Sequence, residues 1–193
     1  MAINIEGICK AYDGRAVLQD LSMTLEKGQC YCLMAPSGAG KTTLFRLLMG
    51  LETADRGRIT GIAPGDVAVM FQEDRLLMHL SPVQNVLPVC TEKPDLQQIR
   101  KNLLQILPAE CLEQPVRELS GGMKRRVALA RALYYPGRLI LLDEPFTGLD
   151  RETKEAVIHY LQIHRNGRTL LMATHDREDA ELLDAEILHL ERA

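Results

Sequence analysis

"APSGAGKTT", residues 35–43, is the stretch that decides the fold of this chain. The apolar run "QCYCLMA" (29–35) leads into it, and "LFRLLMG" (44–50) follows, with the apolar density and final glycine of a buried helix. A strand, a glycine-rich loop and a helix in this order present backbone N–H groups and the positive end of a helix dipole to an anion. The stretch therefore predicts a phosphate-binding loop in an α/β fold.

Each residue type in this loop has a chemical reason. Gly38 and Gly40 allow the backbone to approach phosphate without a side chain between them, and Lys41 reaches the outer phosphates as a point charge. Thr42 follows the lysine and offers its hydroxyl to Mg²⁺. The alternative is a glycine-rich turn that binds nothing, and the flanking strand and helix argue against it.

The first position of the loop departs from the usual pattern, which asks for glycine where this chain has Ala35. Pro36 favours an extended backbone at the residue before it, and alanine adopts that conformation easily. If the loop instead needs a positive φ at this position, alanine is strained by on the order of 1 kcal/mol. Both alternatives are open on sequence alone.

Composition excludes several classes of protein. The 193 residues suit one compact domain, and a net charge of −3 gives no broad positive field, so nucleic acid is not expected as a partner. The start "MAINIEGICK" has no secretory pattern and no run of residues is long and apolar enough to span a membrane, which predicts a cytoplasmic chain. Five scattered cysteines, an odd count, are interpreted as small core residues in a reducing compartment.

The order of predicted elements indicates a parallel sheet. Strand signals fill residues 2–35 and return at 65–72, whereas prolines and helical spacing mark 74–118, with one helical pattern over 95–107. From residue 120 helices alternate with apolar strands: helix 121–133, strand 138–143, helix 151–164, strand 168–174, a helix from 176 and strand 185–190. Apolar strands that alternate with helices are typical of a largely parallel sheet covered on both faces.

Two further stretches carry candidate site residues. "RLILLDEP" (138–145) is an apolar strand that ends in Asp143 and Glu144, and the carboxyl ends of parallel strands are where ligands bind. Asp143 is expected to hold Mg²⁺ and Glu144 to polarise an attacking water, unless the strand simply ends in polar residues. "ELSGGMKRR" (118–126) begins a predicted helix with a hydroxyl and two glycines, which suggests a second anion site. Its basic run 124–126 is predicted to be a solvated helix face.

With these residues identified, the chain resembles the nucleotide-binding domain of ABC transporters. The family marks occur in family order: "APSGAGKTT" as Walker A, Gln72 in "FQEDR" as the Q-loop, "LSGGM" as the signature, "LILLDE" as Walker B, "GLD" as the D-loop and "ATHD" as the switch histidine. The resemblance implies a P-loop NTPase with a RecA-like parallel-sheet core, an antiparallel β layer and an inserted helical lobe. It implies one domain over 1–193, with the core in 1–73 and 119–193 and the helical subdomain in 74–118.

The resemblance also implies the role of each site residue in binding and hydrolysing ATP with Mg²⁺. Glu144, His175 and Gln72 would be catalytic, and Thr42, Gln72 and Asp143 would hold the metal. The nucleotide would be bound by Tyr12 of "KAYDG", stacked on adenine, and by Ser37, Gly38, Ala39, Gly40, Lys41, Thr42 and Thr43. Ser120, Gly121 and Gly122 would contact the γ-phosphate held by a second cassette, with Asp150 at the shared interface.

The implied partners are a second ABC cassette, as a homodimer, and polytopic membrane permease subunits, with a solute-binding protein if the system is an importer. The chain would then lie in the cytoplasm, peripheral on the inner face of the cell membrane. The wording "FQEDRLL…NV" looks like ATP-binding subunits of nitrate, sulfonate and taurine importers. The segment "RLLMHLSPVQNV" (75–86) either forms an apolar contact for a membrane subunit or belongs to the core of the helical lobe.

Other ATPase classes fit less well. DNA-repair and chromosome-organising relatives place long coiled coils between Walker A and signature, and the gap from Lys41 to Ser120 is too short for these. Translation-linked relatives carry two cassettes, and a nucleotide kinase has no use for "LSGG" or the switch histidine. A regulatory module that binds ATP without hydrolysis is a further alternative, against which Glu144 and His175 argue.

Overall fold

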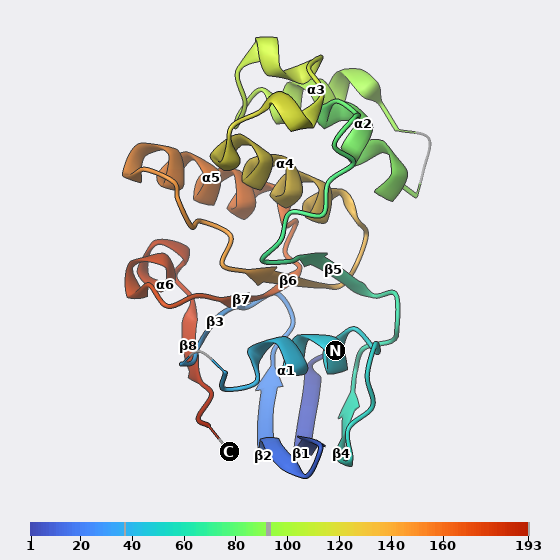
Figure 1. Ribbon diagram of the computed structural model, residues 1–193, viewed down its shortest axis with the longest axis vertical. Helices are drawn as coiled ribbons and strands as arrows, with labels where there is room; N and C mark the ends of the chain where they lie inside the picture. The colour runs from blue at the N-terminus through green and yellow to red at the C-terminus, as the bar shows by residue number, and fades with distance from the viewer. Residues whose placement is uncertain (37, 92–93, 193) are drawn as a thin grey trace. The chain divides into compact units, whose positions relative to one another are not determined.

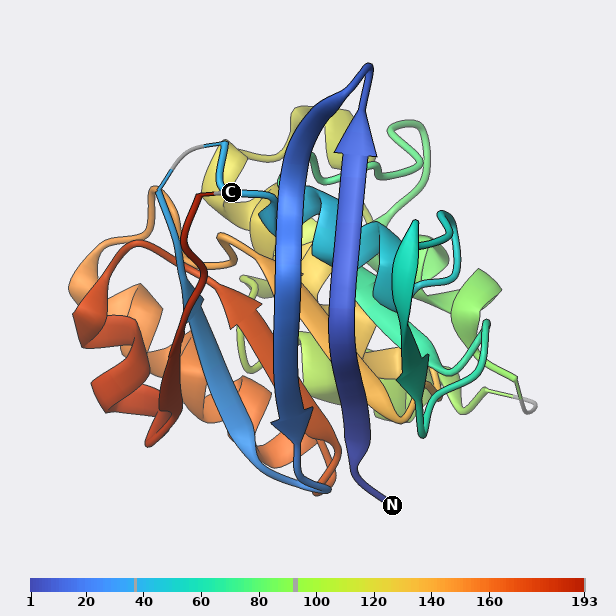
Figure 2. The ribbon, with the colours of Figure 1, turned by 90° about the horizontal axis from the view of Figure 1, so that it is seen from below.

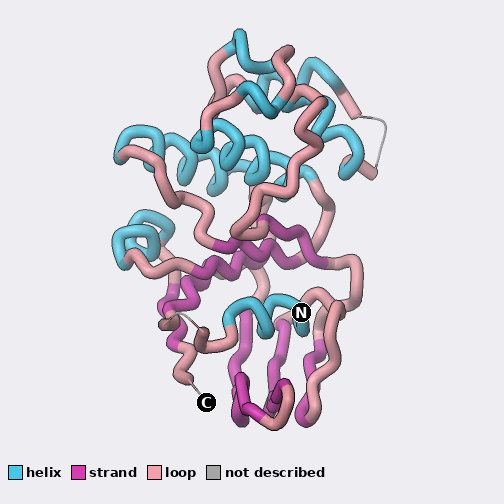
Figure 3. The backbone as a smooth tube through the Cα atoms, in the orientation of Figure 1, coloured by secondary structure: helices cyan, strands magenta, loops and turns pink. Residues whose placement is uncertain are grey.

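The computed structural model describes residues 1–36, 38–91 and 94–192, and the chain divides into two compact units. The first unit comprises Met1–Ala68, Gly137–Leu141 and Gly167–Ala193, and the second comprises Val69–Pro136 and Leu142–Asn166. Most strands belong to the first unit, whereas the second is built mainly of helices and turns (Figure 3).

An antiparallel sheet of three strands forms one part of the first unit. It contains β1 (Ile3–Tyr12), β2 (Arg15–Leu25) and β4 (Arg56–Thr60) in the order β2-β1-β4, so that β1 lies in the middle (Figure 2). Asp13 and Gly14 join β1 to β2 with φ values of 49° and 77°. Two consecutive positive φ angles are what a two-residue hairpin turn requires, and Asp-Gly supplies them at little cost. The implied antiparallel β layer is confirmed.

The second sheet is parallel and has the strand order β5-β6-β7-β3-β8. Its strands are β3 (Cys30–Met34), β5 (Val67–Met70), β6 (Leu139–Asp143), β7 (Thr169–Ala173) and β8 (Glu186–His189). The three inner strands are buried along nearly their whole length. Because both faces of these strands are covered, they appear in the sequence as continuous apolar runs rather than as alternating patterns. The predicted α/β class with a parallel sheet is therefore confirmed.

Among the described residues of the first unit, two segments are helical (Figure 1). The first, α1 (Lys41–Leu48), begins directly after the glycine-rich loop and buries Leu44, Phe45 and Leu47. The second, α6 (Arg177–Leu183), connects β7 to β8 and is capped by Asp176, whose carboxylate accepts a hydrogen bond from the Glu178 N–H.

The second unit contains α2 (Pro82–Val86), α3 (Leu96–Leu103), α4 (Gly121–Tyr134) and α5 (Arg151–His164). Helix α4 packs against α2 and α5, and α2 packs against α3 (Figure 1). Short 3-10 turns lie between these helices, at Leu87–Val89, Ala109–Leu112 and Val116–Glu118. Each α-helix of the unit starts after a side chain that accepts a backbone N–H from its first turn. These capping residues are Ser81, Asp95, Ser120 and Asp150. Across the described residues, no helix has the combined length and apolarity to cross a lipid bilayer.

Candidate functional site

The glycine-rich loop connects β3 to α1, and its lysine is held by the loop itself. Lys41 Nζ donates to the carbonyl of Ala35 at 2.7 Å and lies 3.5 Å from the carbonyl of Pro36. The N–H of Ala39 donates to the same Pro36 carbonyl at 3.2 Å. Ser37, predicted to bind nucleotide, lies outside the described residues. The loop thus closes on itself through backbone carbonyls and a lysine ammonium.

Two different physical reasons explain why residues 38 and 40 of this loop are glycines. Gly38 has a φ of 79°, and a Cβ added to it would meet no described atom within 4 Å, so backbone conformation alone favours glycine there. Gly40 has a φ of 97°, and a Cβ added to it would lie 2.7 Å from Leu18 Cδ2 and 3.0 Å from Val17 O. Ala35 does not have a positive φ, so the alanine that departs from the usual pattern is unstrained.

The two threonines that follow the lysine lie differently. Thr42 is exposed in the first turn of α1, where its hydroxyl is accessible to a ligand. Thr43 and Ala39, which the resemblance also assigns to nucleotide binding, have buried side chains, so their contribution to a bound phosphate would come from the backbone.

Tyr12 lies at the end of β1 with a partly exposed ring. Its hydroxyl donates to the Glu52 carboxylate, which also accepts a hydrogen bond from Arg46 Nη1 at 3.1 Å. The hydrogen bond from Tyr12 and the neighbouring Arg46 lower the pKa of Glu52. Lys10 Nζ lies 5.4 Å from the centroid of the Tyr12 ring. These contacts fix the phenol at the end of the hairpin.

His175 follows β7 and is exposed. The residues on either side of it are held in place: Thr174 Oγ1 donates to Asp179 Oδ2 at 2.6 Å, and the Asp176 N–H donates to Thr174 Oγ1 at 3.1 Å. The turn that carries the imidazole is therefore fixed by hydrogen bonds on both sides.

The two carboxylates at the end of β6 differ in backbone conformation. Asp143 is the last residue of the strand, and Glu144 follows with a φ of 51°. A residue with a side chain in this left-handed region costs roughly 1–2 kcal/mol. Thr147 Oγ1 lies 3.4 Å from Glu144 Oε2, a long hydrogen bond.

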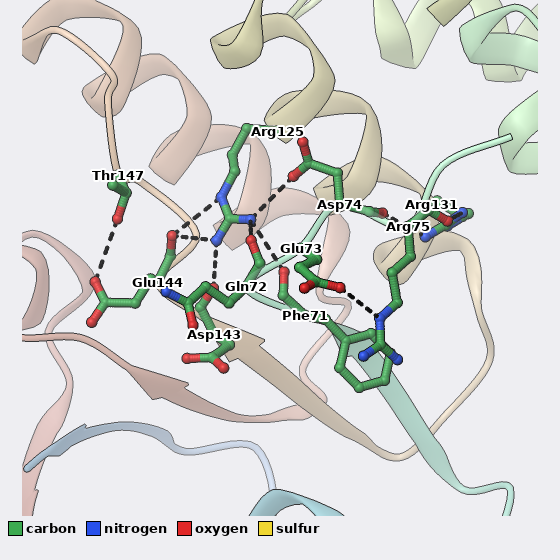
Figure 4. A network of polar contacts seen from close by, with 10 residues as sticks. All are labelled: Phe71, Gln72, Glu73, Asp74, Arg75, Arg125, Arg131, Asp143, Glu144 and Thr147. Carbon is green, nitrogen blue, oxygen red and sulfur yellow. Dashed lines mark hydrogen bonds and ion pairs between the residues drawn. The ribbon is translucent and has the colours of Figure 1, made fainter. Parts of the chain in front are cut away.

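Arg125 of α4 is a buried residue of this region that the sequence did not reveal. The basic run 124–126 is predicted to be solvated, and for Arg125 that prediction is wrong, since it is only 8% exposed. Its guanidinium donates to the backbone carbonyls of Asp143 and Glu144 (Figure 4). The helical spacing contained the signal: Arg125 shares one face of α4 with Ala128, Leu129 and Ala132, all of which are buried.

Gln72 lies two residues beyond β5, in the second unit, with an exposed side chain. Its backbone carbonyl accepts a hydrogen bond from Arg125 Nη1 at 2.7 Å, and Asp74 Oδ1 lies 3.1 Å from the same nitrogen. The structure therefore brings the segment that carries Gln72 and the backbone of Asp143 and Glu144 onto one guanidinium (Figure 4).

Part of the segment 75–86 is exposed, as a contact for a membrane subunit requires, and part is buried, as a core segment of the helical lobe requires. Leu77 and Met78 are 48% and 41% exposed, whereas Val83 and Val86 are buried. Asn85 is fully buried and ties the exposed part down, since it accepts from the Leu77 N–H at 2.7 Å and donates to the carbonyl of Leu77 at 3.0 Å.

The start of α4 is exposed and open. Ser120 caps the helix by accepting a hydrogen bond from the Met123 N–H at 3.3 Å. A Cβ added to Gly121 would meet no described atom within 4 Å, and one added to Gly122 would lie 3.3 Å from Leu149 Cδ2. Neither glycine has a positive φ. Nothing among the described residues of this chain therefore explains why residue 121 is a glycine.

Asp150 caps α5 and is exposed. Its carboxylate accepts hydrogen bonds from the N–H of Thr153 at 2.9 Å and from Thr153 Oγ1 at 2.8 Å. These two bonds lower the pKa of Asp150.

The predicted residues are thus distributed over both units. Tyr12, the glycine-rich loop and His175 belong to the first unit, and the remaining candidates belong to the second: Gln72, Ser120, Gly121, Gly122, Asp143, Glu144 and Asp150. A strand, a closed glycine-rich loop with lysine and threonine, and a helix in an α/β fold define a nucleotide-binding P-loop ATPase.

Comparisons of the sequence identify the family. The profile described as ABC transporter matches residues 18–147, more than half of the chain. The aliphatic sulfonates import ATP-binding protein of Agrobacterium fabrum is 38% identical over 99% of this chain and 76% of its own length. The Nod factor export ATP-binding protein I of Rhizobium johnstonii is 34% identical over 99% of this chain and 67% of its own length. The chain belongs to the ABC transporter family, as its ATP-binding and ATP-hydrolysing domain.

Solved structures agree on the fold. A dimeric bacterial ABC transporter cassette superposes with a TM-score of 0.84 at 24% identity, over 98% of this chain and 94% of that one. An ATP-binding subunit of an ABC transporter gives a TM-score of 0.86 at 22% identity, over 100% of this chain and 88% of that one. The predicted ABC cassette fold is confirmed.

Proposed function

We infer that this chain is the subunit that binds and hydrolyses ATP to drive solute transport through separate membrane subunits. The observation that carries the proposal is the family match over residues 18–147, because that stretch includes both the phosphate loop and Glu144. The whole chain, 1–193, acts in this proposal as one cassette, with a core in 1–73 and 119–193 and a helical subdomain in 74–118.

Lys41 and the loop amides are proposed to hold the phosphates of ATP. The ammonium already lies against the loop carbonyls, so a phosphate oxygen would exchange with a neutral carbonyl for the same cation. Thr42 contributes its exposed hydroxyl, and Tyr12 stacks on the adenine. The remaining contacts come from Ser37, Gly38, Ala39, Gly40 and Thr43.

Mg²⁺ is proposed to bind to Thr42, Gln72 and Asp143. These residues offer a hydroxyl, an amide and a carboxylate oxygen, which are the hard donors that Mg²⁺ prefers, and the side chains of Thr42 and Gln72 are exposed. When bound together with ATP, Mg²⁺ neutralises part of the phosphate charge. Lys41 adds a second positive charge for the same phosphates.

Glu144 is proposed to take a proton from the attacking water. The water oxygen forms a bond to the γ-phosphorus, the bond from that phosphorus to the bridging oxygen breaks, and ADP leaves with the electron pair. His175 is proposed to contact the γ-phosphate and to keep the water in line, and Gln72 to orient water and metal. The fixed backbone on both sides of His175 suits a positioning role.

A second copy of the cassette is proposed to complete each site. Gly121 needs neither a positive φ nor a close approach within the described part of this chain, and a γ-phosphate of another chain at the start of α4 would explain the glycine. Ser120 and Gly122 would bind the same phosphate, and Asp150 would lie at the shared interface. The unit of function is then a homodimer that holds two ATP molecules.

The membrane partner is proposed to be a polytopic permease whose cytoplasmic side contacts the exposed Leu77 and Met78. The cassette would therefore lie on the inner face of the cell membrane. Similarity to proteins named for aliphatic sulfonates import supports an importer of the nitrate, sulfonate and taurine type, which would also use a solute-binding protein.

The test compares the wild type with Glu144→Gln, with Glu186→Gln as a control for an exposed glutamate on β8. Steady-state hydrolysis of ATP and size exclusion in ATP and Mg²⁺ are measured for all three. We expect the wild type and the control to hydrolyse ATP, and Glu144→Gln to bind ATP, fail to hydrolyse it and elute as a dimer. Hydrolysis by Glu144→Gln at the wild-type rate contradicts the catalytic assignment.

A further inference from the structure

We propose that Arg125 is the positioning residue of the hydrolytic carboxylate. Its guanidinium holds the backbone of Glu144 in a strained conformation and joins it to the segment that carries Gln72. The proposal rests on the catalytic role proposed for Glu144, and it assigns to Arg125 a role that acts through the backbone of Glu144.

Arg125 donates to two separate segments of backbone (Figure 4). On one side, Nε donates to the Glu144 carbonyl at 3.2 Å, and Nη2 donates to the carbonyls of Asp143 and Glu144. On the other side, Nη1 donates to the carbonyl of Phe71 at 3.1 Å and to that of Gln72 at 2.7 Å. A guanidinium has five N–H donors in a rigid fork, and here its three nitrogens all take part.

Because the charge of Arg125 is buried, its ion pair and hydrogen bonds are needed to stabilise it. Arg125 is buried, and the carboxylate that faces it is Asp74, whose Oδ1 lies 3.1 Å from Nη1. A buried charge persists only where a counter-ion and hydrogen bonds replace its water, and here an ion pair and a set of backbone carbonyls do so. The site is thus built around the guanidinium and would not be satisfied by a neutral side chain.

The contacts of Arg125 matter because the backbone of Glu144 is strained. Its φ of 51° is unfavourable for any residue with a side chain, and Pro145 restricts it further, because the residue before proline has fewer allowed conformations. Such a backbone persists only where the surroundings over-determine it. Arg125 supplies that constraint, since two of its nitrogens donate to the Glu144 carbonyl. The direction of the Glu144 side chain follows from the conformation that is held.

A second arginine of α4 contacts one of the two segments that Arg125 joins. Arg131, less than two turns further along α4, donates to the carbonyls of Asp74 at 3.0 Å and Arg75 at 2.8 Å. Both carbonyls belong to the segment that follows Gln72. Arg125 therefore bridges this segment and Glu144, whereas the bonds of Arg131 stabilise the segment itself.

Arg125→Lys is the informative variant, because lysine keeps the positive charge but carries its three donors on one nitrogen and lacks the rigid fork that spreads the donors of arginine over both segments. Arg131→Lys weakens the hold on the Gln72 segment alone. Arg168→Lys is the control for a half-buried arginine elsewhere, since Arg168 Nη1 donates to the Gly137 carbonyl in the first unit. For each variant, kcat, KM, the Kd for ATP, the melting temperature and the amide hydrogen exchange of 142–147 are measured.

We expect Arg125→Lys to lower kcat on the order of 10- to 100-fold, as a displaced catalytic group does, while KM and the Kd for ATP change less than about threefold. Amide exchange is expected to rise in 142–147 more than in the rest of the chain. Arg131→Lys and Arg168→Lys are expected to keep kcat within about threefold of the wild type. Asp74→Asn, a milder change, is expected to lower kcat by about three- to tenfold at an unchanged Kd for ATP.

Three results overturn the proposal. The first is a folded Arg125→Lys or, if that variant does not fold, a folded Asp74→Asn that hydrolyses ATP at the wild-type rate. The second is a parallel loss of kcat, ATP affinity and melting temperature, which would indicate a general structural role. The third is an equal loss of kcat in Arg168→Lys. Failure of the proposed function is distinguishable, because it appears as unchanged hydrolysis in Glu144→Gln.

Discussion

The substitution Gly121→Ala tests whether Gly121 is required for folding or for binding a ligand. In the described part of this chain a Cβ at residue 121 meets no atom within 4 Å, and its φ is not positive. Gly121 is the first residue of α4, where alanine is the better helix former. Within the isolated chain the substitution is therefore free of strain, whereas the methyl group would stand where the proposed γ-phosphate of the second cassette approaches.

The expected effects have opposite signs. Replacing a compatible glycine by alanine stabilises a protein by about 0.4–1 kcal/mol, mainly by restricting the unfolded chain. In a domain of this size, about 1 kcal/mol corresponds to about 2–4 °C, so the melting temperature is expected to rise by about 1–4 °C. Loss of one hydrogen bond to a charged phosphate costs about 1.5–3 kcal/mol, which corresponds to about 10- to 150-fold in hydrolysis or dimer affinity.

Circular dichroism follows unfolding, because the chain contains no Trp for intrinsic fluorescence. Steady-state hydrolysis of ATP follows function, and size exclusion of Glu144→Gln with and without Gly121→Ala follows the ATP-dependent dimer. A protein that is at least as stable as the wild type but hydrolyses poorly supports a phosphate of another chain at the start of α4. If Gly121→Ala hydrolyses ATP and dimerises as the wild type does, the open glycine has another reason and the proposed shared site is refuted.

Two other perturbations follow from the geometry. Gly40→Ala is expected to lower the melting temperature and weaken ATP binding, since its φ of 97° disfavours a side chain by roughly 1–2 kcal/mol and the new Cβ would lie 2.7 Å from Leu18 Cδ2; an unchanged melting curve contradicts this. Burial lowers the pKa of His164 below 6.5, so the unfolded chain binds the proton more readily. Stability is therefore expected to fall as pH drops below 6.5 towards the folded pKa. The free energy of unfolding in urea is measured at about pH 7.5 and about pH 5.5, above and below 6.5, and is expected to differ less between the two pH values in His164→Gln than in the wild type.

Local chemistry predicted the elements of the fold well. Buried strands such as β6 appear as apolar runs, and the Asp13-Gly14 turn marks the first hairpin. The helix predicted over 95–107 ends earlier, at Leu103. Gln105 and Ile106 then donate to carbonyls three residues back, so the chain tightens into a 3-10 turn ahead of Pro108. The strand order β5-β6-β7-β3-β8 lay beyond the sequence, because long-range pairing decides it.

The candidate site divides in the same way. Lys41, Asp143 and Glu144 could be named from sequence because each follows an apolar strand with a spacing that its chemistry requires. The positive φ of Glu144 could not, since an isolated glutamate before proline favours other conformations. For the basic run 124–126, charge alone predicts a solvated face, whereas the apolar periodicity that includes Arg125 indicates burial. The helical period was the better guide, because a guanidinium that finds a counter-ion and carbonyl acceptors can lie in the core.

One turn of α4 connects the two anionic groups of the proposed reaction. The helix begins at Gly121, where the phosphate of the second cassette is proposed to bind, and Arg125 lies four residues further along it. At about 1.5 Å per residue this separation is about 6 Å of rigid helix. Because Arg125 holds the strained backbone of Glu144, a displacement of the start of α4 would be transmitted to the carboxylate of the same chain. The strained backbone of Glu144, the residue proposed to activate water, is therefore connected through Arg125 and one turn of α4 to the helix terminus where the phosphate is proposed to bind.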